Sequence, residues 1–137
     1  MVAIRHYAAA PILALLAGCT GQPMGPDRDP AGEAALAHAL AGKVAGPPLS
    51  CLPSHRSDNM EVIDRDTIIY RDGRTTYVQN TDGYCYPNGP RGGFTLVTTR
   101  VGTDELCRGD IGKVINSSSG TFAGSCTFNE FIPYRAP

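Results

Sequence analysis

The chain has 137 residues, and once an expected export signal is removed this length leaves room for one domain of ordinary size. Twelve Lys and Arg residues against thirteen Asp and Glu residues give a formal net charge of −1, so no global positive field recruits nucleic acid, and none is expected as a partner. Hydrophobic residues make up 42% of the chain, which permits a core, and five cysteines are the most unusual feature of the composition.

Residues 1–18 have the pattern of a bacterial export signal. Arg5 supplies a positive charge, and the apolar stretch over residues 7–17 fits a signal peptide and is too short to cross a bilayer. The stretch ends in Leu16-Ala17-Gly18-Cys19, which resembles the lipobox of bacterial lipoproteins. This resemblance implies removal of the signal before Cys19 and acylation of that cysteine on its sulfur and on the new amine. A soluble secreted chain with a chance cysteine is the alternative.

Residues 19–29 are predicted to form the lipidated cysteine and a flexible tether, because they are rich in Gly, Pro and charge and show no apolar period. Ten flexible residues reach roughly 17 Å, and two or more acyl chains anchor a protein stably, so the folded part should stay near a membrane. Thr20 follows the cysteine where an Asp would favour inner-membrane retention. By resemblance to Gram-negative lipoproteins, this implies an outer-membrane protein that faces the periplasm.

A helix is predicted over residues 30–46. Asp29 is a suitable N-cap, Pro30 occupies the first helical position, and an apolar residue then recurs every four positions. Gly46, followed by two prolines, would end the helix.

Residues 47–137 are predicted to form a small β domain of short strands separated by turns. Strands are expected over 60–63, 67–71, 75–79, 94–101, 105–107, 111–115 and 126–134. Asp72-Gly73 is the strongest hairpin signal, and a two-residue turn there sets Ile69 opposite Thr76. The same turn sets Arg71 opposite Arg74, which favours a turn one or two residues longer. The fold class is therefore mainly β, a small antiparallel sheet or barrel-like meander with one N-terminal helix, stapled by disulfides.

With Cys19 lipidated, four cysteines remain, and an even number in an exported chain predicts two disulfides. Three connectivities are possible. We favour Cys51–Cys126 with Cys85–Cys107, because a bridge between the first and last cysteines would fasten terminal strands together. No metal is expected, since no cysteine pair has the C-x2-C spacing typical of zinc sites.

No catalytic residue and no cofactor are predicted. The chain lacks a G-x-S-x-G serine, a free cysteine nucleophile and a phosphate-binding glycine loop. Asp64 and Asp66 are a possible carboxylate pair, but turn chemistry explains both. The sequon at Asn116 and the Arg108-Gly109-Asp110 tripeptide are attributed to chance.

Four residues are candidates for partner binding, namely Tyr84, Tyr86, Arg91 and Arg100. Folding could gather these arginines with Arg108 and Lys113 into a basic face that binds a sugar or an anionic glycan, although a merely solvated face is the competing interpretation. The loops at 80–92 and 116–124 are the places where we expect a partner to bind.

Four motifs together resemble those of a group of short four-cysteine envelope lipoproteins. They are CLP at 51–53, an I-D-x-x-T-I-x-Y hairpin at 63–70, LCRGDI at 106–111 and GSC at 124–126. The resemblance covers residues 30–135 and implies the fold and the location, and it transfers no activity. We therefore expect a non-enzymatic binding or envelope-structural module with an envelope protein or peptidoglycan as partner. An inhibitor of an envelope-directed hydrolase and an enzyme acting on glycan or peptidoglycan are the alternatives.

Overall fold

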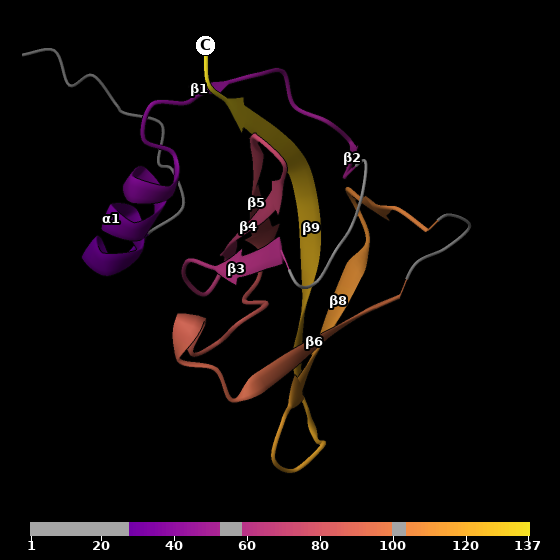
Figure 1. Cartoon of the computed structure of the whole chain (residues 1–137). Helices are drawn as coiled ribbons and strands as arrows, with labels where there is room; N and C mark the ends of the chain where they lie inside the picture. The colour runs from indigo at the N-terminus through magenta and orange to yellow at the C-terminus, as the bar shows by residue number, and fades with distance from the viewer. Residues whose placement is uncertain (1–27, 53–58, 100–103) are drawn as a thin grey trace, which may run out of the picture.

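The computed structural model describes residues 28–52, 59–99 and 104–137. The predicted fold class is confirmed: one helix precedes an antiparallel sheet that curls into a half-barrel, and two disulfides join its parts (Figure 1). The elements are α1 (Pro30–Ala39), β1 (Val44–Ala45), β2 (Cys51–Leu52), β3 (Met60–Val62), β4 (Thr67–Asp72), β5 (Thr75–Asp82), the 3-10 helix η2 (Gly89–Arg91), β6 (Phe94–Thr99), β7 (Leu106–Cys107), β8 (Ile111–Asn116) and β9 (Phe122–Arg135). No helix within these residues is long and apolar enough to span a membrane.

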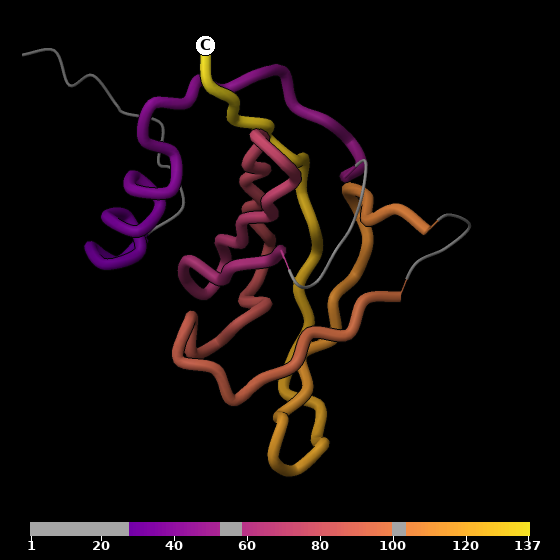
Figure 2. Tube along the Cα trace, viewed as in Figure 1, coloured from indigo at the N-terminus to yellow at the C-terminus, as the bar shows by residue number. Residues whose placement is uncertain are grey.

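The last strand, β9, is the spine of the sheet. The strand order is β3-β4-β5-β9-β8-β6, and β1 pairs with the C-terminal end of β9. The two halves of β9 have different neighbours, since residues 122–127 pair with β8 and residues 127–134 with β5, and the two ladders overlap at Thr127. Register shifts interrupt both ladders, and such bulges bend a strand. The bend in β9 lets a single sheet curve around its own core, as the tube in Figure 2 shows.

Two apolar clusters lie on opposite faces of β4 and β5. Ile68 and Tyr70 face the inside of the curl, where they belong to the cluster that contains Phe128 and Phe131. Ile69 and its neighbours Ile63 and Val78 face α1, and they pack against Leu36 of that helix. Because side chains alternate along a strand, a helix on one face and the curled sheet on the other bury the whole run from Thr67 to Tyr70.

The helix is shorter than predicted. It begins as expected, with Asp29 Oδ1 accepting a hydrogen bond from Gly32 N at 2.7 Å, but it ends at Ala39 instead of residue 46. Gly42 adopts a φ of 70°, and the chain then forms β1, which pairs with β9. The apolar Val44 that extended the helical pattern is thus a strand residue, 56% exposed, and the hydrogen bonds it makes belong to the sheet.

The β4–β5 hairpin forms with a shifted turn. Asp72 pairs with Thr75, so the two loop residues are Gly73 and Arg74, and Ile69 lies opposite Val78 instead of Thr76. Gly73 has a φ of 56° and Arg74 does not have a positive φ, which is the type II′ pattern with Gly in the first loop position. Arg71 therefore lies opposite Thr76, and Arg74 lies in the loop. The predicted repulsion between Arg71 and Arg74 does not arise in this register.

The predicted disulfide pairing is wrong. The bonds are Cys51–Cys107, across the directly opposed residues of β2 and β7, and Cys85–Cys126, from the segment after β5 to β9. The sheet order explains both bonds. Because β5 pairs with β9, the chain leaving β5 passes Cys126, while β2 pairs with β7 and thereby holds Cys51 away from Cys126.

Candidate functional site

A cavity of about 600 Å³ lies between the start of α1, the turn from β3 to β4, and residues 87–91. We call it the helix–turn cavity. Helix α1 contributes small side chains, and the polar lining groups are Asp29, Asp64, Arg65, Asn88 and Arg91. Three segments that are distant in the sequence therefore bring two carboxylates, two guanidinium groups and one amide to one hollow.

Asp64 forms the buried floor of the helix–turn cavity. Its Oδ1 atom accepts hydrogen bonds from the backbone N–H groups of Asp66 at 3.1 Å and Thr67 at 2.7 Å, which is the turn chemistry predicted for this segment. Its Oδ2 atom is buried and accepts no hydrogen bond from the described residues. An unpartnered buried oxygen of this kind is costly to the fold.

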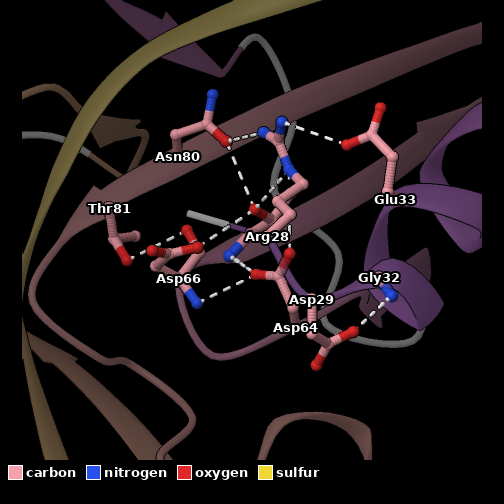
Figure 3. Close-up of polar contacts among 9 residues, drawn as sticks. Arg28, Asp29, Gly32, Glu33, Asp64, Asp66, Asn80 and Thr81 are labelled. Carbon is pink, nitrogen blue, oxygen red and sulfur yellow. Dashed lines mark hydrogen bonds and ion pairs between the residues drawn. The ribbon is translucent and has the colours of Figure 1, made fainter. Parts of the chain in front are cut away.

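Arg28 compensates the charge of Asp64 from behind the cavity (Figure 3). Its Nε atom lies 3.7 Å from Asp64 Oδ2, which is an ion-pair distance beyond hydrogen-bond range. The other end of the guanidinium group donates a hydrogen bond from Nη2 to Asn80 Oδ1 at 2.6 Å. Arg28 therefore compensates the charge of Asp64, whose Oδ2 atom lies buried between Arg28 and the first turn of α1.

The first turn of α1 packs directly on the floor. A side chain on Gly32 would place its Cβ 3.0 Å from Asp64 Oδ2, so any larger residue would force Asp64 or the helix to shift by a few tenths of an ångström. Asp29, the second carboxylate of the lining, caps the helix through its bond from Gly32 N. Both lining carboxylates thus already have structural roles.

Arg65 lies over an exposed aromatic ring beside the cavity. Its guanidinium carbon is 4.4 Å from the ring centroid of Tyr84, a cation–π contact, and the ring is half exposed. Arg65 was not among the predicted site residues, because its place in the Asp64–Asp66 turn gave no local sign that Tyr84 lies next to it. Only the pairing of β4 with β5 brings these segments together.

The structure separates the predicted partner-binding residues. Arg91 lines the cavity, and Tyr84 adjoins it through Arg65. Tyr86 is buried in the core and donates a hydrogen bond to Met60 Sδ at 3.6 Å, and burial raises the pKa of this phenol. Arg100 and Cys19 lie outside the described residues.

Of the residues that could have formed a wider basic face, the described ones, Arg91, Arg108 and Lys113, lie at different places. Arg108 pairs with Glu130 at a different, smaller hollow. Lys113 projects from β8 on the outer side of the sheet, opposite Val97 of β6. The candidate site therefore contains two arginines with balancing carboxylates, and it carries no strong net charge.

Asp66 is the carboxyl group with a raised pKa in this region. Burial is the main cause, and the hydrogen bond and the charge of neighbouring Asp64 add to it. Asp66 does not line the helix–turn cavity, where the carboxylates are those of Asp29 and Asp64. The carboxyl group with the raised pKa therefore lies outside the lining of the helix–turn cavity.

One cluster in the described part of the chain has three groups of the types that bind metals, Cys51, Glu105 and Cys107. Both sulfur atoms form the disulfide between β2 and β7, so they offer no thiolate. Comparisons of the chain with protein-family models, with curated proteins and with solved structures found no match.

Proposed function

We propose that this chain is a lipid-anchored periplasmic protein of the outer membrane that binds a saccharide, such as a peptidoglycan glycan strand, without transforming it. The lipobox at Cys19 supports the anchor and the location. The observation that carries the binding role is the helix–turn cavity, which has two guanidinium groups and one side-chain amide in its lining.

The hydrogen-bonding groups of the cavity call for a ligand that both donates and accepts. The amide of Asn88 both donates and accepts, whereas Arg65 and Arg91 carry only donors and need acceptors. A hydroxyl group serves as both, and a sugar ring presents several hydroxyl groups around an apolar face. The exposed ring of Tyr84, beside Arg65, offers a flat surface of the kind that sugar faces stack on.

The charge of the cavity supports a neutral or weakly charged ligand. Asp29 and Asp64 balance Arg65 and Arg91 within the lining. A strongly anionic ligand would meet the carboxylate on the floor, and a cation would meet the arginines. A saccharide of the envelope satisfies this pattern and is present at the proposed location.

The structural roles of the lining carboxylates favour binding over catalysis. Acid–base hydrolysis of a glycan requires two carboxyl groups free to exchange protons with the substrate. Here Asp29 caps α1, and Asp64 holds the β3–β4 turn and faces Arg28. Asp66, with its raised pKa, lies outside the lining.

Binding of the full chain to soluble peptidoglycan glycan strands, measured by calorimetry in detergent, tests the proposal. Arg91→Ala should weaken binding by about tenfold or more, because a hydrogen bond from a charged donor contributes about 1.5–3 kcal/mol. Arg74→Ala is the matched control, since Arg74 lies in the β4–β5 turn and does not line the cavity. Equal affinity of all three proteins, or turnover of the strands by the purified chain, would contradict the proposal.

A second candidate function is inhibition of an envelope-directed hydrolase through the β8–β9 loop. This loop projects from the end of the sheet (Figure 2) and is held by Asn116, whose Oδ1 accepts bonds from Ser118 N at 3.0 Å and Ser119 N at 3.1 Å. A rigid protruding loop suits insertion into an active-site cleft. Crosslinking in cells from residues 116–124 should then capture a hydrolase, whereas crosslinking from residues 80–92 should capture glycan if the cavity is the binding site.

A further inference from the structure

We propose that two copies of this chain associate by antiparallel pairing of their β6 strands, which would join the two curled sheets into one. This inference concerns an edge of the sheet remote from the helix–turn cavity, and it does not depend on the saccharide proposal. Strand β6 ends the sheet order of the described residues and lies at the front in Figure 1.

The two edges of the sheet differ in how well they are protected against pairing with a further strand. At one edge β3 has only three residues, and its Glu61 forms an ion pair with Arg71 of the next strand. At the other edge β6 has six residues, Phe94-Thr95-Leu96-Val97-Thr98-Thr99, without a charge, a proline or a bulge. Edge strands of monomeric proteins are usually short, charged, bulged or covered, so β6 has the character of a strand that accepts a partner.

The pairing of β6 with β8 determines which backbone N–H and C=O groups of β6 point toward β8 and which point away from it. Ser117 N donates to Gly93 O at 3.0 Å, so Gly93 and Ser117 form a hydrogen-bonded pair. These pairs alternate along an antiparallel ladder, and the N–H and C=O groups of Phe94, Leu96 and Thr98 therefore point away from β8. Three residues with outward-facing groups remain for a further strand.

A second copy of β6 fits these groups symmetrically. In a twofold arrangement centred on Leu96, Phe94 pairs with Thr98 of the other copy and Leu96 with its own counterpart, which gives about six intermolecular hydrogen bonds. Thr95 then lies opposite Val97 of the other copy in a pair that is not hydrogen-bonded, where side chains approach closely. Every outward-facing group finds a partner in this register.

The charges around the edge favour a second copy as the occupant. No charged side chain of β6 meets its counterpart, because residues 94–99 contain none. Among the described residues, the nearest basic residue on the outer face is Lys113 of β8, which would lie three strand spacings from its counterpart, about 14 Å, beyond the screening length of about 8 Å at physiological salt. Two chains held by lipid at the same membrane would also meet at high effective concentration.

The outer face beside β6 is also apolar. Val97, Ile111 and Phe122 are 47%, 52% and 65% exposed, and the registers of β6, β8 and β9 put all three on one face. Edge pairing leaves this face open and doubles its width. Stacking of two such faces is the arrangement that the experiment must distinguish from edge pairing.

Sedimentation of the full chain in excess detergent micelles tests the association. Thr98→Pro removes an N–H group that points away from β8, so it should preserve the β6–β8 ladder and block pairing between copies. We expect the wild type and Thr98→Val to sediment as dimers, and Thr98→Pro to associate about tenfold or more weakly. A monomeric wild type, or equal dimerisation of all three proteins, would overturn the proposal.

Cysteine crosslinking tests the register without depending on the fold of the proline variant. A mixture of Thr95→Cys and Val97→Cys chains should form a reducible heterodimer, because the two positions are directly opposed across the proposed pair. Each variant alone should crosslink much less, since identical positions lie diagonally at about 7–8 Å. Preferential crosslinking of Ile111→Cys or Phe122→Cys with itself would show stacked faces, and capture of a different envelope protein at β6 would show another occupant. Either result would refute edge pairing of two copies.

Discussion

The Nε atom of Arg28 lies 3.7 Å from the Oδ2 atom of Asp64, and this pair ties the first described residue of the chain to the turn between β3 and β4. Both side chains are largely removed from water, with 15% and 7% exposed. Arg28 also bonds to Asn80 on β5 and pairs with Glu33, so it joins the helix, the turn and the sheet. The tether predicted at residues 19–29 includes Arg28 and the helix cap Asp29, whereas the structure places both of them in the folded domain.

Arg28→Ala should destabilise the domain by about 3 kcal/mol, because it leaves the carboxylate of Asp64 buried without a compensating charge. Arg108→Ala is the control, since its ion pair with Glu130 is 60% and 44% exposed and should contribute less than about 1 kcal/mol. Urea denaturation of both variants gives the comparison. Similar small losses for the two substitutions would show that the buried pair contributes no more than a surface pair.

Asp66→Asn should change the dependence of stability on pH. Burial, followed by the bond and charge of Asp64, raises the pKa of Asp66 above its ordinary value of 3.8. Between 3.8 and the raised pKa the folded chain binds more protons than the unfolded chain, so this carboxyl group makes the free energy of unfolding increase as the pH falls through that window. Above the window, the ionised carboxylate weakens the fold.

The asparagine removes this titration and retains an oxygen that can accept the 3.2 Å bond from Thr67 Oγ1. We therefore expect Asp66→Asn to be at least as stable as the wild type at neutral pH, with a difference that shrinks as the pH approaches 3.8. Denaturation curves across this range provide the measurement. A difference independent of pH would mean that Asp66 titrates normally in the folded chain.

Local signals in the sequence predicted local structure well. The Asp29 cap, the Pro30 start and the β4–β5 hairpin all involve residues within a few positions of one another, and the structure contains each of them, the hairpin with its turn shifted by one residue to Gly73-Arg74. The residues at which these elements end were less predictable. The end of α1 depends on β9, more than eighty residues later in the chain, because pairing with β9 draws Val44 into a strand.

The disulfides and the cavity depend on strand order, which no local pattern encodes. Cys85 reaches Cys126 because β5 lies beside β9, and Arg65 reaches Tyr84 because β4 lies beside β5. Loop entropy could not choose between the predicted and the observed pairing either, since the predicted loops of 75 and 22 residues and the observed loops of 56 and 41 residues have summed closure costs within about 0.3 kcal/mol of each other. Arg91 was identified in advance from its residue type, whereas the floor residue Asp64 was assigned only a turn role.

The two disulfides should differ in their accessibility to reductant. Cys85 and Cys126 are 0% and 2% exposed, whereas both sulfur-bearing residues of the β2–β7 bond are partly exposed. Because exchange requires a thiolate to reach the sulfur, limiting reductant should open Cys51–Cys107 first. Alkylation followed by peptide mass mapping identifies the bond that opens. Initial labelling of Cys85 or Cys126 would contradict the expected order.

Loss of either bond should lower the free energy of unfolding by about 2–5 kcal/mol. The Cys85→Ala/Cys126→Ala pair should lie at the upper end of this range, because it also removes buried sulfur atoms from the main core. The Cys51→Ala/Cys107→Ala pair is the matched comparison, since it cuts a bond of similar loop length at the surface. Unfolding by urea under non-reducing conditions measures both.

Gly112→Ala should destabilise the domain through crowding alone. Gly112 lies in β8 with an ordinary strand conformation, and a Cβ there would stand 2.6 Å from Leu96 Cδ1 and 2.9 Å from Cys126 Sγ. Both distances are shorter than real Cβ contacts. The Leu96 side chain can rotate, but the sulfur is held by its bond to Cys85, so we expect a loss of about 1–3 kcal/mol.

A double-mutant cycle separates the two contacts of this alanine. Leu96→Val shortens the side chain on β6 and removes the atom nearest to the new methyl group, so the cost of Gly112→Ala should be smaller in that background. The part that persists belongs to the contact with the disulfide sulfur. Additive effects of the two substitutions would instead show that Leu96 moves aside freely, and that the close approach of β8 to Cys126 alone requires glycine at this position.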